Sequence, residues 1–277
     1  MKKIFTLLLV SLSTCINAEE PRIQIQPKWE LGIGLGGLSI PHYRGSDQRA
    51  DYIAPIPYFR YSGKRLQVDK EGGRFYFYNS ENIKFDISTG FALPVDSDDN
   101  RARTGMSNLD AVIELGPRLQ FSLYQSEDKN FRLRFALPLR EAYELGELTS
   151  IGWVFSPYLE LRYFQSGWET SAAAGPVWAT EKYHDYFYQV DPQYVTSTRS
   201  QYNAQSGYSG SRLTLTMSKR FDQLFFGVFA RYDDLQGASF IESPLVKQKD
   251  SFMIGIALSW VFKKSEKYSE YIVKKVE

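Results

Sequence analysis

The stretch Phe252-Met253-Ile254-Gly255-Ile256-Ala257-Leu258-Ser259-Trp260-Val261-Phe262 decides the fold. Its even-numbered residues are large and apolar, whereas most of its odd-numbered residues are small. Successive side chains of a β-strand point to opposite faces, so this stretch predicts a strand with one apolar face along its whole length. A barrel wall in a membrane needs this pattern, because lipid contacts its outer face while water or polar side chains contact the inner face.

The same alternation recurs along most of the chain. Leu133 and Phe135, for example, alternate with Arg132 and Arg134, whereas helical spacing would scatter these residues around an axis. The clearest runs cover 109–125, 130–140, 150–165, 168–183, 207–221, 223–235 and 250–262. Several runs have the roughly 9 to 11 residues of a tilted spanning strand, against about 5 to 6 for average strands. The sequence therefore predicts a transmembrane barrel rather than a soluble β-sandwich.

Connectors of two lengths alternate along the chain. Short turns are predicted near 62–63, 79–81, 125–129, 165–167 and 221–223. Longer loops are predicted at 42–51, 95–108, 141–149, 184–206 and 236–249. Outer-membrane barrels have short turns on the periplasmic side and longer loops outside. Strict alternation requires one more reversal, and Asp69-Lys70-Glu71-Gly72-Gly73 supplies turn residues for it.

These observations predict an all-β fold: an antiparallel transmembrane β-barrel of about twelve strands, with both termini periplasmic. About ten strands is the alternative, if the segment around Asp69 is one irregular strand. The mature sequence has no apolar run of the roughly 20 residues that a spanning helix needs, which excludes a helical membrane protein. Lys+Arg 33 against Asp+Glu 32 leaves a formal charge of +1, so there is no electrostatic case for nucleic acid as a partner.

The N-terminus has the three parts of a secretory signal peptide. Met1-Lys2-Lys3 is basic, an apolar run follows to Val10, and small residues lead to a cleavage point after Ala18. Residues 1–18 are therefore expected to be removed on export to the outer membrane of a Gram-negative cell. The barrel is expected at 19–262, with a polar periplasmic tail at 263–277 that includes a short helix from Tyr268 to Val276.

Cys15 is the only cysteine, and it lies inside the expected signal peptide. Leu12-Ser13-Thr14-Cys15 loosely resembles a lipidation motif, but Thr14 before the cysteine argues against lipidation. With Cys15 removed, the mature chain has neither a disulfide nor a cysteine ligand for a metal, which fits export to an oxidising compartment.

The sequence contains two histidines, His42 and His184, both in predicted outer loops. Neither has metal-ligand spacing or a nucleophile motif beside it. The segment 42–47 places a histidine, a serine and an aspartate together, but a catalytic triad is assembled in space and not by sequence neighbours. We therefore expect no catalysis, no cofactor and no metal. A Ser-His lipid hydrolase on the barrel wall is the enzymatic alternative.

A large polar set alternates with the apolar faces and is expected to point into the barrel. It comprises Lys84, Asp86, Asp110, Glu114, Arg118, Arg132, Arg134, Glu160, Arg162, Arg212 and Arg220. In a narrow barrel such residues pair across strands and fix the register, or they line a path for a small solute. The Tyr-rich loop 184–206 is long enough to recognise a partner or to fold into the barrel mouth.

Several loop segments resemble the MltA-interacting protein (MipA/OmpV) family of outer-membrane proteins. The segment 41–47 carries Pro41, Tyr43, Gly45, Ser46 and Asp47; further on come Tyr183, Tyr186 and Phe187, then Tyr202 and Gly207. The sequence departs from the family pattern at Tyr188, where a glycine is expected, and at 195–200, where an alanine-rich stretch is expected.

The resemblance implies a non-enzymatic scaffold surrounded by outer-membrane lipid. In that role the barrel brings a peptidoglycan-cleaving lytic transglycosylase, a murein hydrolase, together with a bifunctional murein synthase. Nothing carries over as an active-site residue. The partners would contact periplasmic turns or the C-terminal tail. A narrow porin-like channel for small solutes and a surface adhesin or antigen are the alternatives.

Overall fold

The structure is a computed structural model that describes residues 27–70 and 72–268. The expected signal peptide, Cys15 and all of the expected tail helix beyond Tyr268 lie outside the described residues.

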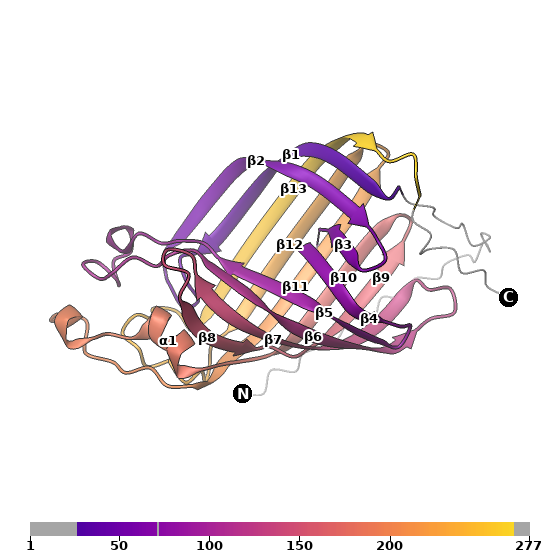
Figure 1. Cartoon of the computed structure of the whole chain (residues 1–277). Helices are drawn as coiled ribbons and strands as arrows, with labels where there is room; N and C mark the ends of the chain where they lie inside the picture. Colours follow the sequence, from indigo (N-terminus) through magenta and orange to yellow (C-terminus); the bar gives the residue numbers. More distant parts are fainter. Residues whose placement is uncertain (1–26, 71, 269–277) are drawn as a thin grey trace, which may run out of the picture.

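The chain folds into one antiparallel sheet of thirteen strand segments. They are β1 (Trp29–Pro41), β2 (Arg49–Ser62), β3 (Leu66–Asp69), β4 (Gly72–Asn79), β5 (Ile83–Ala92), β6 (Val112–Gln125), β7 (Phe131–Glu144), β8 (Ser150–Phe155), β9 (Tyr158–Gln165), β10 (Trp168–Ala179), β11 (Gly207–Phe221), β12 (Leu224–Asp234) and β13 (Asp250–Lys264). Because β13 pairs with β1 and β10 pairs with β11, the sheet closes into a barrel (Figure 1).

Two of the segments, β8 and β9, occupy one place in the wall. Both pair with β7 on one side and β10 on the other. The break between them contains Pro157, which has no N–H to donate to a ladder. The barrel therefore has 12 strands, as predicted, and the reversal expected at 69–73 is the connection between β3 and β4.

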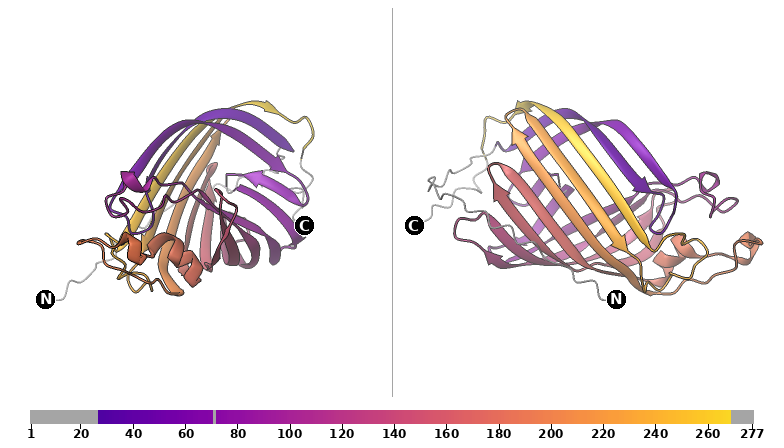
Figure 2. Two further views of the ribbon diagram at one scale, coloured as in Figure 1. Left: turned by 60° about the vertical axis from the view of Figure 1, so that its left-hand side comes forward. Right: turned by 180° about the vertical axis from the view of Figure 1, so that it is seen from behind.

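Short turns gather at one end of the barrel and long loops at the other (Figures 1 and 2). The expected strand 168–183 is wrong at its end, because β10 stops at Ala179 and residues Glu181–Tyr188 form helix α1. Ala179 pairs with Gly207, the first residue of β11, so a longer β10 has no partner strand beyond this point. Two single-turn 3-10 helices, Ser97–Asp99 and Pro192–Tyr194, complete the loop structure.

The outer face of the wall is apolar, as β13 illustrates. Ile256 and Leu258 are each 52% exposed, whereas Ser259 between Leu258 and Trp260 is buried. An apolar belt around the outside of the barrel suits contact with lipid, because strand pairing satisfies most backbone groups of the wall. Among the described residues, no helix has the length and hydropathy to cross a membrane.

One strand, β2, has a long free edge. It pairs with β1 along its whole length but with β3 only at Tyr61 and Ser62 (Figure 1). The Ser62 N–H donates toward β1, to the carbonyl of Lys28. The backbone N–H and C=O groups of even-numbered residues in β2 therefore point toward β1, and those of odd-numbered residues point toward the free edge. Pro55 and Pro57 are odd-numbered and lack an N–H. They remove two donors that would otherwise face lipid without a partner.

The main apolar core lies in the loops rather than in the wall. Phe240, Leu235 and Leu245 are completely buried there. Tyr188 of α1 stacks on Phe240 with ring centroids 3.7 Å apart. The long loops therefore form one packed layer over their end of the barrel, which we call the loop cap: residues 42–48, 93–111, 145–149, 180–206 and 235–249.

Candidate functional site

The barrel interior contains a charge cluster built on Asp86. This side chain lies on the inner face of β5 and is completely buried. Arg118 on β6 donates to both carboxylate oxygens, over 2.9 and 2.8 Å, and Gln120 Nε2 donates over 2.8 Å. The register pairs Asp86 directly with Arg118, so strand pairing itself brings the two charges together.

Interior carboxylates on other strands also contact arginine or lysine. Glu160 on β9 is an example, because Arg134 and Arg162 both donate to it. The other pairs are Glu30 with Arg60 and Arg220, Asp69 with Arg74, Glu114 with Arg140, Glu169 with Lys70 and Arg162, and Asp233 with Arg44 and Arg212. Cations outnumber carboxylates in this set, so the interior is basic although the chain carries a formal charge of only +1.

The structure places every residue of the expected polar set on a wall strand except one. Lys84 and Asp86 lie on β5, Glu114 and Arg118 on β6, Arg132 and Arg134 on β7, Glu160 and Arg162 on β9, and Arg212 and Arg220 on β11. Asp110 precedes β6, and its backbone carbonyl accepts from Tyr186 Oη over 3.2 Å within the loop cap. The expectation that Asp110 extends the strand alternation is therefore wrong.

Sequence reasoning missed several interior charges. They are Glu30, Asp69, Lys70, Arg74, Arg140, Glu169, Arg231 and Asp233. The alternation offered a signal for Arg231 and Asp233, because both flank the outward Tyr232 on β12. For Lys70 there was no such signal, since its place depends on how a turn is directed.

The β3–β4 hairpin is directed into the barrel. In the left view of Figure 2 it projects from the wall toward the interior. Lys70 Nζ at its tip lies 2.7 Å from the carboxylate of Glu169 on β10 and 2.6 Å from Ser218 Oγ on β11. These two strands lie on the opposite side of the ring from β3 and β4. The hairpin therefore crosses the interior and is fastened at its far side.

The segment Pro41 to Asp47 joins the loop cap to the wall. Pro41 ends β1, and Tyr43 Oη donates to the carbonyl of Leu245 over 2.9 Å. Gly45 has φ of 90°, where a side chain is strained, and its N–H donates to Ser251 Oγ on β13. Two contacts hold the neighbouring loop: Ser46 Oγ accepts from Asn100 over 3.1 Å, and Asp47 pairs with Arg101 over 3.0 Å.

The aromatic residues of the second loop segment pack inside the same cap. Tyr183, Tyr186 and Phe187 lie on α1, and Tyr183 Oη donates to Glu114 of the wall over 3.1 Å. Tyr202 Oη donates to the carbonyl of Ser239 over 3.1 Å. Burial raises the pKa of Tyr183 well above its ordinary value, so the phenol stays neutral and remains a donor.

His184 and Ser209 form a hydrogen-bonded pair that the sequence did not reveal. Nε2 of His184 lies 2.5 Å from Ser209 Oγ, and Nδ1 lies 2.6 Å from the carbonyl of Gln205. Because a carbonyl only accepts, Nδ1 carries the proton and Nε2 accepts from the serine. Both side chains are completely buried, and the His184 ring packs against Phe240. An enclosed pair of this kind is typical of a core histidine whose hydrogen bonds are satisfied. A catalytic serine, by contrast, must be open to its substrate.

His184 makes the loop cap sensitive to acid. Burial lowers the pKa of His184 below its ordinary value of 6.5. The opened cap binds the proton more readily, so we expect the stability of the cap to fall as pH drops below about 6.5. His184→Ala should remove this pH dependence and destabilise the cap by about 2–4 kcal/mol through a cavity and an unpaired serine.

Hydrogen exchange of α1 amides between pH 5 and 8 measures both effects, after correction for intrinsic exchange rates. An exposed turn variant, Asp222→Ala, is the control. Unchanged protection of α1 in His184→Ala would contradict the structural role of this histidine.

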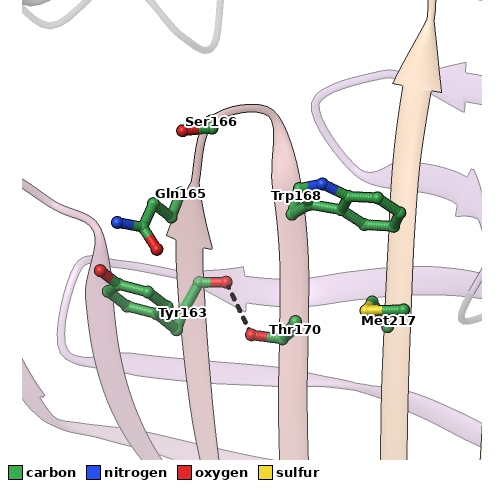
Figure 3. A pocket seen from close by; sticks show the side chains of 6 residues that line it. All are labelled: Tyr163, Gln165, Ser166, Trp168, Thr170 and Met217. Atoms are coloured by element: carbon green, nitrogen blue, oxygen red, sulfur yellow. Dashed lines mark hydrogen bonds between the residues drawn. The ribbon is translucent and has the colours of Figure 1, made fainter. Parts of the chain in front are cut away.

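Two surface hollows lie away from the interior charges. One of about 260 Å³ lies near the turn at Ser166, between Tyr163, Trp168 and Met217 on the outer face of the wall (Figure 3). The other, of about 630 Å³, lies in the loop cap and is bordered by Arg103 and residues of α1. Within the described ranges, no group of His, Cys, Asp and Glu has the arrangement of a metal site.

A family model described as MltA-interacting protein MipA matches residues 33–262. No curated protein matches the sequence.

Several solved structures align with most of this chain at low sequence identity. A NanC porin is 8% identical, with 83% of this chain and 98% of that chain covered and a TM-score of 0.39. The CymD monoaromatic hydrocarbon channel is 11% identical, with 87% and 90% covered and a TM-score of 0.37. A Pseudomonas aeruginosa FadL homologue is 9% identical, with 85% and 90% covered and a TM-score of 0.31.

Proposed function

Since this chain belongs to the family of the MltA-interacting protein MipA, we propose that it is a non-enzymatic scaffold of the outer membrane. In this role it holds a peptidoglycan-cleaving lytic transglycosylase and a murein synthase next to each other. The observation that carries the proposal is the family match over residues 33–262, which spans nearly the whole barrel. The match also confirms the resemblance found in the loop segments.

The interior of the barrel supports a scaffold because it is crossed by side chains. A scaffold needs a rigid wall, whereas a channel needs a continuous wet path. Here Lys70 spans the interior to Glu169, and the loop cap is packed around Phe240 at the other end. Both features stiffen the barrel without serving transport.

The turn end of the barrel is the surface that such partners would use. Murein enzymes act in the periplasm, and we place the short turns and both chain ends there. The first and last described residues meet at this side, because Lys28 N donates to the carbonyl of Lys267 over 2.8 Å and Pro27 pairs with Tyr268. Residues 269–277 continue from this point and offer a polar segment to a partner.

Deleting residues 269–277 should lower the capture of both murein enzymes severalfold, because the tail is part of the proposed contact. The deletion leaves β13 intact, so the barrel should still insert and keep its heat-modifiable gel mobility. The measurement is photo-cross-linking in whole cells from a probe at Ser166, in a short turn. A probe at Ser197, an exposed serine of the loop cap, is the matched control and should capture neither enzyme. Full capture by the shortened chain would remove the tail from the proposal, and no capture by the intact chain would refute the scaffold.

A narrow channel for small solutes is the second candidate function. The specific observation in its favour is the basic interior. Positive side chains along a water-filled path would select anions, and a scaffold has no need of such selection. Conductance of the purified barrel in a planar bilayer separates the two, because a scaffold should stay closed.

A further inference from the structure

Three interior cations have no carboxylate partner in the part of the chain that the structure describes. They are Lys84 on β5, Arg132 on β7 and Arg231 on β12. Every interior carboxylate named above is already paired with another arginine or lysine. Strand register and salt bridges therefore do not account for these three charges.

Lys84 and Arg132 belong to one cluster at the turn end. The charges that act most on Lys84 are those of Arg134, Arg74, Arg132 and Arg162, so five cations from four strands converge there. Arg132 and Arg134 are two residues apart on β7, and their side chains therefore point to the same face.

Lys84 and Arg132 contact aromatic rings rather than carboxylates. Glu169 attracts Arg132 from a distance, but its own ion pairs are with Lys70 and Arg162. The guanidinium of Arg132 lies over the Phe164 ring at 5.3 Å, and Lys84 Nζ lies 5.9 Å from the centre of the Tyr76 ring. Nε of Arg132 is buried and has no hydrogen-bond partner. An aromatic face leaves the donors of a cation available for a further ligand.

Asp69, Glu160 and Glu169 also lie in this cluster, but the cations outnumber them, so the excess of like charge destabilises an empty barrel. Repulsion between like charges is strong where the effective dielectric is low, and it is weaker in a wet interior. A bound anion offsets this repulsion, because it attracts each of the cations. The planar guanidinium group of arginine also matches the geometry of carboxylate and phosphate oxygens. The cluster therefore has the chemistry of an anion site rather than of a structural network.

We propose that Lys84, Arg132 and Arg134 form a binding site for a small soluble polyanion that carries phosphate or carboxylate groups. Arg134 contributes while it also holds Glu160, and the other two cations bind through donors that the protein leaves free. The site opens toward the short turns, since Lys84 and Arg132 lie at the turn ends of β5 and β7. This site does not depend on the scaffold proposal.

Pyrophosphate is a suitable probe for the site. Isothermal titration of the full-length barrel in a neutral detergent, at constant ionic strength, should show saturable binding. Lys84→Gln and Arg132→Gln should each weaken it at least about tenfold, which is the loss of one charge-assisted contact. Lys219→Gln is the matched control, because Lys219 lies over the Trp168 ring and donates to the Ser166 carbonyl at the turn. The control should bind pyrophosphate as the wild type does.

Thermal unfolding gives a second measurement that a structural role would not reproduce. Without pyrophosphate, Lys84→Gln should unfold at the same or a higher temperature than the wild type, because repulsion is relieved. Glu160→Gln should unfold at a lower temperature, because its arginine partners lose their counter-charge. The proposal is overturned if the wild type binds no pyrophosphate, if Arg132→Gln binds it equally well, or if Lys84→Gln is destabilised as much as Glu160→Gln. No murein enzyme takes part in the titration or in the unfolding experiment. Their outcome therefore neither supports nor contradicts the scaffold proposal.

Discussion

Asp86→Ala should lower the free energy of unfolding of the barrel by about 3–5 kcal/mol, because it leaves the charge of Arg118 buried without a counter-charge. Asp86 is completely buried and accepts three hydrogen bonds, two from Arg118 and one from Gln120. Its backbone pairs with Tyr76 of β4 and with Arg118 of β6, so the loss falls where the short strand β4 joins the longer strands of the wall. Urea unfolding in lipid vesicles, followed by heat-modifiable gel mobility, measures the change.

Two variants test the cause of that loss. Glu127→Ala, at an exposed position of a turn, should change the free energy by no more than about 0.5 kcal/mol. The double variant Asp86→Leu with Arg118→Met should recover much of the stability, because replacing a buried pair by apolar groups of similar volume removes the stranded charge. If Asp86→Ala is as stable as the wild type, the pair does not hold these strands together.

The barrel could be predicted because the alternation that indicates it is present within the sequence of each strand. Each wall strand must face lipid on one side, so the alternation appears in every run, as in Ile254 to Trp260. Even the short β3–β4 hairpin was predicted, since turn residues mark a reversal whatever the strand length. The end of β10 was not, because it depends on Gly207, which lies 28 residues further along the chain.

The interior and the loop cap were predicted less completely, because their contacts join residues far apart in sequence. Alternation places Arg118 and Arg134 on the inner face, but it does not say which carboxylate each one meets. The pair of His184 and Ser209 depends on how α1 packs against the start of β11. Asp110 was misassigned because a loop residue can continue a strand's alternation by chance.

The direction of the β3–β4 hairpin is the feature furthest from any sequence signal, and it leads to the largest functional prediction. Lys70→Ala should raise the conductance of the purified barrel severalfold, from a closed or nearly closed wild type. Lys70 donates to Glu169 over 2.7 Å and to Ser218 over 2.6 Å, and these contacts hold the hairpin tip across the interior. Without them the tip is free to leave the path. Single-channel recording in a planar bilayer measures the effect.

Lys70→Arg is the matched control, because a guanidinium still pairs with Glu169 and should keep the barrel closed. High salt should raise the wild-type conductance by more than the bulk conductivity does, since it screens a pair that is only three-quarters buried. A Lys70→Ala barrel that stays closed would show that the loop cap, with Tyr188 stacked on Phe240, seals the interior without the hairpin. In that case the basic interior does not serve transport. The result would argue against the channel and would remain consistent with the scaffold.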